Sequence, residues 1–215
     1  MAAATGFAAT GCLSAVSGDG GDEDSYLGPP EDAHEDADYP TYGERVPDAE
    51  LLGVLSGEYV TTEQDTEYLM TFSYTSCPTE CLWMVSALVH TERMILEQGH
   101  EPPRVLVASF DPERDTPERM REYADRMGID KDRGNWSMLR PEDKEEAEEV
   151  LGGDFGISFE RRSTGEDSVY DYIHTTLILL VNEDGYVERT YTNDEPNPHL
   201  IADDVSRLRE AQETA

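Results

Sequence analysis

The chain has 215 residues, of which 37% are hydrophobic, and its 48 acidic side chains against 16 basic ones give a formal net charge of −32. A field of that sign repels phosphate backbones and anionic lipid head groups, which excludes nucleic acid and a polybasic membrane patch. No run approaches the roughly 20 apolar residues of a membrane-spanning helix. Three cysteines are too few for a disulfide-stapled scaffold.

The acidic residues are spread through the whole chain, and the only lysines are Lys131 and Lys144. A folded chain with this charge repels itself in dilute buffer, whereas molar salt shortens the Debye length to roughly 3 Å. The composition is similar to that of proteins from salt-loving archaea, and an acidic protein of ordinary habitat is the alternative. We expect a halophilic protein, which says nothing about its chemistry.

The first twelve residues are small and apolar and end in Ala9-Thr10-Gly11-Cys12, which resembles the end of a lipoprotein signal. No charged region precedes them, so a disordered leader with a free thiol is the alternative. From Asp19 to Glu50 twelve acids face one base, Arg45, and so polar a stretch cannot offset its ordering entropy by burial. We expect a leader and disordered acidic tether over residues 1–45 and one folded domain over 46–215.

The domain opens with a strand, a long helix and a second strand. Residues 69–74 and 105–110 are short runs rich in apolar, β-branched and aromatic side chains, as in buried parallel strands. Between them, apolar residues recur at helical spacing from Cys81 to Leu96, and Gly99 ends the run. This order predicts a βαβ unit.

Two more helices are predicted next. Thr116-Pro117 offers an N-cap hydroxyl followed by a first-turn proline, and Gly128 ends the helix that they begin. A second helix is expected from Pro141 to Gly152.

The last elements are a hairpin and a helix. Residues 177–181 and 186–191 read as strands, and Asp184-Gly185 lies between them where a tight turn is favoured. A helix with apolar residues between 200 and 208 follows. The order β-α-β-α-α-β-β-α predicts an α/β fold with one open sheet flanked by helices.

A cysteine pair, Cys77-Pro-Thr-Glu-Cys81, lies between the first buried strand and the long helix. Open α/β sheets place their sites at such junctions, where the helix N-terminus favours a thiolate. Cysteines four apart on a helix have Cβ atoms about 5–6 Å apart, wider than the 3.5–4.5 Å of a relaxed disulfide but suited to two sulfurs on one metal ion. A disulfide and a merely structural pair of buried thiols remain alternatives.

Three motifs in order resemble the Sco/SenC family, the copper-binding assembly factors of cytochrome c oxidase. They are an aromatic strand leading into Cys-Pro-x-x-Cys, a strand ending in Asp-Pro-x-Arg-Asp-Thr-Pro, and a histidine before a strand that ends in an acidic-Gly turn. In this chain they are Thr71-Phe-Ser-Tyr-Thr-Ser-Cys77-Pro-Thr-Glu-Cys81, Asp111-Pro-Glu-Arg-Asp-Thr-Pro117, and His174 with Asp184-Gly185. The resemblance covers about Val46 to Ser206 and implies a thioredoxin-like fold, with a central mixed sheet flanked by helices.

The resemblance also places His174 beside the cysteine pair, where thioredoxin-like oxidoreductases present a cis-proline. Two thiolates and one imidazole suit copper, particularly Cu(I), whereas zinc prefers a fourth ligand. We therefore expect Cys77, Cys81 and His174 as copper ligands. Asp111 and Asp115 are expected to support them through hydrogen bonds, not to ligate.

Two departures from the family pattern concern partner recognition. Thr79 stands where many members have an acidic residue, and Leu82 stands where they have a proline. The other histidines, His34, His90, His100 and His199, are expected to be solvated or structural, and Met84 and Met94 to belong to a helix core.

By this resemblance we expect a metallochaperone at the extracytoplasmic face of the membrane. The residues before Cys12 lead us to expect a lipid anchor on that cysteine, and we expect a monomer. It receives copper from a donor protein and delivers it to the CuA centre of an oxidase subunit. The rival hypothesis is a thiol-disulfide oxidoreductase in which Cys77 and Cys81 are the redox pair. Both activities could coexist, since an oxidised pair cannot hold Cu(I).

Overall fold

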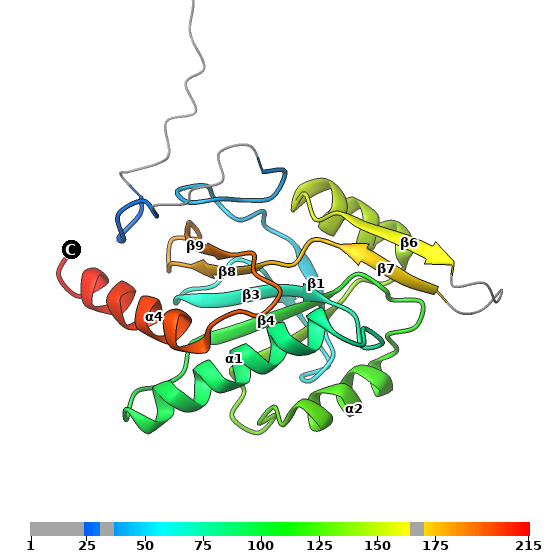
Figure 1. The fold of residues 1–215 in the computed structure, drawn as a ribbon, viewed down its shortest axis with the longest axis horizontal. Coiled ribbons are helices and arrows are strands. Elements are labelled where there is room, and N and C mark those ends of the chain that lie inside the picture. Colours follow the sequence, from blue (N-terminus) through cyan, green and yellow to red (C-terminus); the bar gives the residue numbers. More distant parts are fainter. Residues whose placement is uncertain (1–23, 31–36, 164–169) are drawn as a thin grey trace, which may run out of the picture.

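The computed structural model describes residues 24–30, 37–163 and 170–215, and Figure 1 shows their arrangement. The strands are β1 (Glu50–Gly53), β2 (Glu58–Thr61), β3 (Tyr68–Ser73), β4 (Arg104–Ser109), β5 (Trp136–Arg140), β6 (Phe159–Ser163), β7 (Tyr170–His174), β8 (Ile178–Val181) and β9 (Val187–Tyr191). The helices are α1 (Glu80–Glu97), α2 (Pro117–Met127), α3 (Lys144–Glu146), the π-helix η1 (Ala147–Asp154) and α4 (Pro198–Gln212).

Seven of the strands form one mixed sheet in the order β2-β1-β5-β4-β3-β8-β9. The three central strands β5, β4 and β3 run parallel to one another, and β1 and β8 pair antiparallel on either side of them. The parallel strands are buried along almost their whole length, so β3 and β4 are mostly apolar on both faces, with small hydroxyl residues as their only polar ones after Arg104. The predicted βαβ unit and the mixed central sheet are confirmed.

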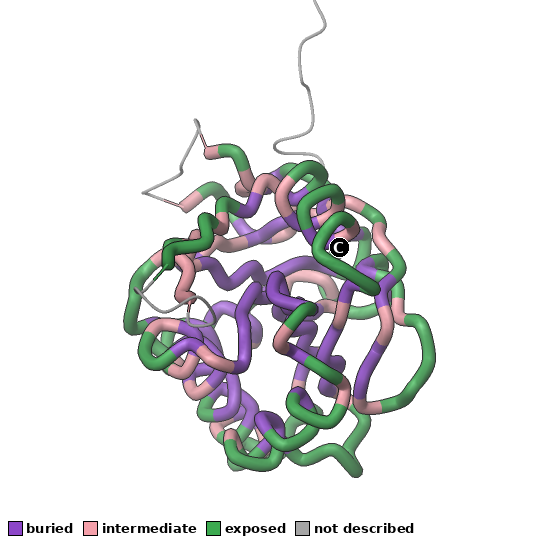
Figure 2. The backbone as a smooth tube through the Cα atoms, turned by 90° about the vertical axis from the view of Figure 1, so that its right-hand side faces the viewer, coloured by how far each residue is buried: buried purple, intermediate pink, exposed green. Residues whose placement is uncertain are grey.

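Helices cover the sheet on both sides, and the buried residues lie between these layers (Figure 2). On one side α1 contacts both α4 and α2, and in Figure 1 the three lie below the sheet. The helix η1 lies on the other side, and Phe155 at its end packs edge-on against Phe72 of β3 with ring centroids 5.4 Å apart. A strand with both faces covered needs apolar residues on both, which explains the composition of β3.

The residues predicted to begin and end the helix α2 have the geometry expected of helix caps. The Thr116 hydroxyl accepts a hydrogen bond from the backbone N–H of Arg119 at 3.3 Å, and Gly128 adopts a left-handed φ of 74° at the C-terminus. The hairpin of β8 and β9 also forms as predicted, with Gly185 at φ 86° in its turn. The last helix, α4, begins with Asn197 as its N-cap.

The predicted element order is incomplete, because it lacks β1, β2, β5, β6 and β7. The first two have only four residues each, too few to show a period. The strands β6 and β7 are largely unburied and form a separate two-stranded ribbon, so no buried face marks them. The helix expected from Pro141 to Gly152 is a single turn, α3, followed by η1.

Parts of the acidic segment expected to be a free tether pack against the domain. The buried carboxylate of Glu188 accepts the backbone N–H groups of Tyr26 at 2.8 Å and Leu27 at 2.9 Å. The N–H of Gly43 donates to the carbonyl of Val187 at 2.9 Å. Most of these hydrogen bonds involve backbone groups, which every residue has, so the amino-acid composition of the segment does not predict them. The leader, with Cys12, lies outside the described residues.

Candidate metal centre

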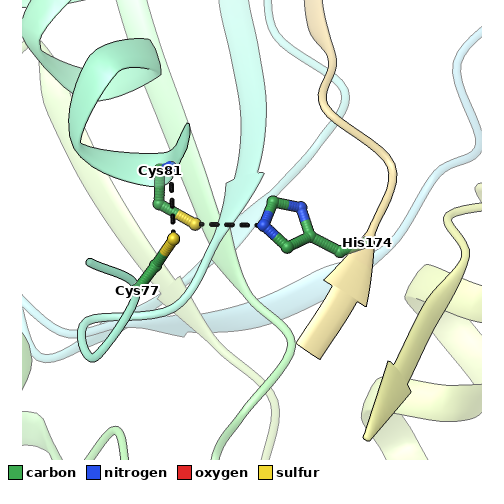
Figure 3. Close-up of side chains that lie close together, drawn as sticks. All are labelled: Cys77, Cys81 and His174. Atoms are coloured by element: carbon green, nitrogen blue, oxygen red, sulfur yellow. Dashed lines mark hydrogen bonds between the residues drawn. The ribbon is translucent and has the colours of Figure 1, made fainter. Parts of the chain in front are cut away.

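Cys77 and Cys81 lie where β3 passes into α1. The strand ends at Ser73, the N–H of Cys77 closes a turn onto the carbonyl of Tyr74 at 3.2 Å, and α1 begins at Glu80. Cys77 is 4% exposed and Cys81 is fully buried, and both thiols are free. The N–H of Cys81, in the first turn of α1, points at the Cys77 sulfur at 3.4 Å (Figure 3). A helix N-terminus thus faces the Cys77 sulfur.

His174 comes to the two sulfurs from β7, outside the main sheet (Figure 3). Its Nε2 lies 3.6 Å from the Cys81 Sγ, and its Nδ1 lies 3.0 Å from the carbonyl oxygen of Thr175. One ligand atom from each of Cys77, Cys81 and His174 lies within 4.8 Å of the other two. The three residues that the sequence predicts as ligands are therefore together, although 93 positions separate His174 from Cys81.

The two thiols differ in their tendency to ionise. A hydrogen bond from the Cys81 thiol lowers the pKa of Cys77 well below its ordinary value, against the opposing effect of burial. Burial raises the pKa of Cys81, and the neighbouring Cys77 raises it further. Burial also acts to lower the pKa of His174, but its bonds to Cys77 and Thr175 outweigh burial and raise that pKa. The arrangement thus favours one thiolate beside one thiol.

His174 holds its ring between aromatic neighbours. The Phe110 ring centroid is 5.1 Å away, and the Tyr74 ring stands edge-on to the imidazole at 6.0 Å. The carbonyl of Thr175 accepts a hydrogen bond from Nδ1–H, which leaves the lone pair of Nε2 directed at the sulfurs. Imidazole in this tautomer is a metal ligand that needs no deprotonation.

Asp115 supports the loop that carries Cys77. Its buried carboxylate accepts the Thr75 N–H at 3.0 Å, the Thr75 hydroxyl at 2.5 Å and the Ser109 hydroxyl at 2.6 Å. Burial raises the pKa of Asp115, while these donors act in the opposite direction. Asp115 thus binds the loop at Thr75, two positions before Cys77. Its carboxylate is not in the group of three ligand atoms.

Asp111 supports the ribbon that carries His174. It pairs with the Arg114 guanidinium and accepts the hydroxyl of Tyr170 at 2.8 Å. Arg114 also donates to the carbonyl of Tyr170 at 2.8 Å and stacks on its ring at 3.7 Å. The two aspartates therefore hold the two halves of the site, one the cysteine loop and the other the histidine strand.

Glu80 is a neighbour that sequence reasoning missed. Its Oε2 lies 3.7 Å from the Cys77 sulfur, and its carboxylate accepts the hydroxyl of Thr79. That hydrogen bond lowers the pKa of Glu80. Arg114 and Tyr170 were also missed as supports, although Arg114 lies inside the Asp-Pro-x-Arg-Asp motif and Tyr170 lies four residues before His174.

None of the remaining candidates that the structure describes belongs to this group of three. His90, His100 and His199 are exposed, and His34 and Cys12 lie outside the described residues. Met84 is fully buried and accepts the Thr71 hydroxyl at its sulfur, while Met94 packs against the core. The expectation that these two methionines belong to the core is confirmed. Among the described residues no helix is long and apolar enough to cross a membrane.

Comparisons with known proteins add a family to this geometry. The sequence profile named SCO1/SenC matches residues 56–210. Bradyrhizobium japonicum ScoI, solved with copper bound, is 24% identical with a TM-score of 0.60, over 77% of this chain and 99% of that one. A SCO1/SenC family lipoprotein of Bacillus anthracis is 21% identical with a TM-score of 0.65, over 77% and 95%.

A third structure is BsSco, described as a member of the Sco family of cytochrome c oxidase assembly proteins with a disulfide switch. It is 26% identical with a TM-score of 0.60, over 78% of this chain and 92% of that one. The likeness covers 92–99% of each of these solved chains, and the matched profile, residues 56–210, contains both cysteines and the histidine. The chain belongs to the SCO1/SenC family.

Proposed function

We propose that this protein binds a copper ion with Cys77, Cys81 and His174 and delivers it to the CuA centre of a terminal oxidase. The observation that carries the proposal is the placement of the three ligand atoms within 4.8 Å of one another in the described chain. Copper-bound ScoI and the oxidase assembly role of BsSco support the choice of cargo and recipient.

The donor set fits copper. Two sulfurs and one imidazole nitrogen are soft to intermediate ligands, and three of them complete the coordination that Cu(I) accepts. The Cys77 thiolate is favoured before any metal arrives, whereas the Cys81 thiol must lose its proton on binding. Burial of both sulfurs shields the cargo from competing ligands.

Delivery requires that one ligand can leave. His174 is the least buried of the three and belongs to the β6–β7 ribbon, which shares no strand pairing with the main sheet. The cysteines, in contrast, sit on the loop and helix of the core. We infer that the recipient's ligands displace His174 first while both sulfurs still hold the ion.

A thiol-disulfide oxidoreductase is the second candidate, and the contrast between the two thiols favours it. Cys77 has a lowered pKa at a helix N-terminus, as an attacking thiol does, and Cys81 lies buried beside it as a resolving thiol. The disulfide switch described for BsSco supports a redox role for the pair. The two functions exclude each other at any moment, since a disulfide has no thiolate to offer.

Copper titration and a cell assay test the proposal. Purified protein with Cys12→Ser is expected to bind one copper ion per chain, and Cys77→Ser or Cys81→Ser to abolish high-affinity binding. In cells that lack the protein, oxidase activity should return with the wild type and not with either serine variant. Copper binding by the double serine variant, or full oxidase activity without the gene, would contradict the proposal.

We also propose that a lipid on Cys12 holds the domain at the extracytoplasmic face of the membrane, as a monomer. The small residues before Cys12 and the lipoprotein among the similar structures support this. Native protein is expected in the membrane fraction, and Cys12→Ser in the soluble one. An unmodified Cys12 with the leader intact, seen by mass spectrometry, would refute the anchor.

A further inference from the structure

A carboxylate stands at the side of the proposed copper ligands. Glu80, in the first turn of α1, has its Oε2 3.7 Å from the Cys77 sulfur. Its oxygens do not belong to the group of atoms that lie within 4.8 Å of one another, so it is beside the three ligands rather than among them. Glu80 is only half-buried, whereas both cysteines are buried.

Thr79 holds this carboxylate on the cysteine side. Thr79 is the N-cap of α1, a position where a hydroxyl ordinarily accepts a backbone N–H, but it makes no such cap bond. Its hydroxyl donates to the Glu80 carboxylate instead. The helix thus forgoes a stabilising bond, and the hydroxyl that would have made it orients Glu80.

The other carboxylates near the site are already occupied. Asp115 accepts three hydrogen bonds from Thr75 and Ser109, and Asp111 is paired with Arg114 and Tyr170. Both are fully buried supports with no contact to a sulfur among the hydrogen bonds of the described residues. Of the three, Glu80 alone directs an oxygen at a proposed ligand.

The chemistry of the two copper oxidation states gives this oxygen a use. Three soft donors satisfy Cu(I), whereas Cu(II) favours four donors in a tetragonal arrangement and accepts harder nitrogen and oxygen ligands. Two thiolates already outweigh the single charge of Cu(I), so a third anion adds only repulsion. The same two thiolates only balance the double charge of Cu(II), so a further anionic ligand is not repelled by a net negative site.

We propose that Glu80 supplies an oxygen ligand to copper in the Cu(II) state only, and so determines how strongly the site prefers Cu(II) over Cu(I). The inference rests on the proposed function, since it assigns a further role at the same copper site. Thr79 is the positioning residue that keeps the carboxylate within reach.

Glu80→Gln tests the inference, because it keeps the shape of the side chain and removes its charge. Glu97→Gln, at the exposed far end of the same helix, is the matched control. Both variants carry Cys12→Ser and are loaded anaerobically. The measurements are the affinities for Cu(I) and Cu(II) by chelator competition, and the Cu(II) electron paramagnetic resonance and thiolate-to-copper absorption spectra.

Glu80→Gln is expected to lower Cu(II) affinity at least about tenfold while Cu(I) affinity changes less than about twofold. A tenfold loss of Cu(II) affinity with Cu(I) affinity unchanged corresponds to a rise of about 59 mV in the Cu(II)/Cu(I) potential. The Cu(II) spectra should change with Glu80→Gln and not with Glu97→Gln. Unchanged Cu(II) spectra in Glu80→Gln would overturn the inference, whereas a wild type that binds neither ion would refute the proposed function instead.

Discussion

Cys77 and Cys81 are four positions apart and have opposite properties. The first lies before the helix, where the Cys81 thiol and the Cys81 N–H both point at its sulfur. The second lies inside the first turn, fully buried against the core. Identical side chains thus become one thiolate and one thiol, which is the starting state for either metal binding or disulfide exchange.

This contrast predicts the titration of the metal-free protein. In Cys12→Ser protein, the ultraviolet absorbance of the thiolate should appear at a pH below the ordinary thiol value of about 8.5, because hydrogen bonds stabilise the charged form of Cys77. Cys81→Ala removes one of these bonds and should raise the midpoint. In Cys77→Ala the remaining thiol should titrate above the ordinary value. A midpoint near the ordinary value in all three proteins would contradict this account.

At the scale of elements, the β6–β7 ribbon is held to the domain by packed rings and by Arg114. Phe159 of β6 stacks on Phe110 with ring centroids 5.2 Å apart, and Tyr172 of β7 stands edge-on to Tyr74 at 5.3 Å. Arg114 donates to the Tyr170 carbonyl, stacks on its ring and pairs with Asp111. Within the ribbon itself, Arg161 stacks on Tyr170 at 3.4 Å. Because β7 ends at His174, the position of one proposed ligand depends on this small cluster.

Arg114→Lys is expected to weaken copper binding several-fold, since lysine keeps the charge but loses the planar stacking and the paired hydrogen bonds. In a His174→Ala background the same change should have little further effect, because the ligand that it positions is absent. Arg207→Lys, on the exposed face of α4, is the control. Chelator competition on the four combinations measures the coupling, and equal losses in both backgrounds would show that Arg114 does not act through His174.

The sequence predicts those helices and strands whose own residues carry the full apolar pattern and the end signals. The segment from Leu69 to Tyr74 is uncharged and rich in apolar and aromatic residues, and Thr116-Pro117 and Gly128 mark the two ends of α2. These two elements could therefore be predicted without knowing what packs against them. The strand β7 reads Tyr-Asp-Tyr-Ile-His and is stabilised by Arg114 and Asp111, which are distant in sequence. The position of His174 followed from the family resemblance, whereas the orientation of Glu80 depends on an N-cap geometry that no residue pattern reveals.

At the scale of the whole molecule, the net charge of −32 far exceeds what the ion pairs among the described residues can neutralise. Many of the pairs among the described residues join partly exposed side chains, as between Lys144 and Glu148, and such pairs stabilise little. The acidic N-terminal segment adds to this field but also contacts the sheet edge through Glu188. We therefore expect stability to depend on screening by the solvent.

Thermal unfolding should show this dependence directly. In molar salt the midpoint is expected to be higher than in about 50 mM salt, because repulsion among the uncompensated carboxylates returns as the Debye length grows. Circular dichroism melts at a series of salt concentrations measure it. Identical midpoints at both extremes would refute the halophilic interpretation and leave the proposed copper site untouched.

The central claim is that His174 is a copper ligand and not a redox residue. A disulfide exchange needs two thiols that can meet, whereas a copper site loses a third of its donors when the imidazole is removed.

The most direct test is the copper affinity of His174→Ala beside the thiol-disulfide redox cycle of the same variant. We predict at least about a tenfold loss of affinity, roughly 1.4 kcal/mol, with Cys77 and Cys81 still able to form and break a disulfide. Wild-type copper affinity in His174→Ala would contradict the account and favour the oxidoreductase.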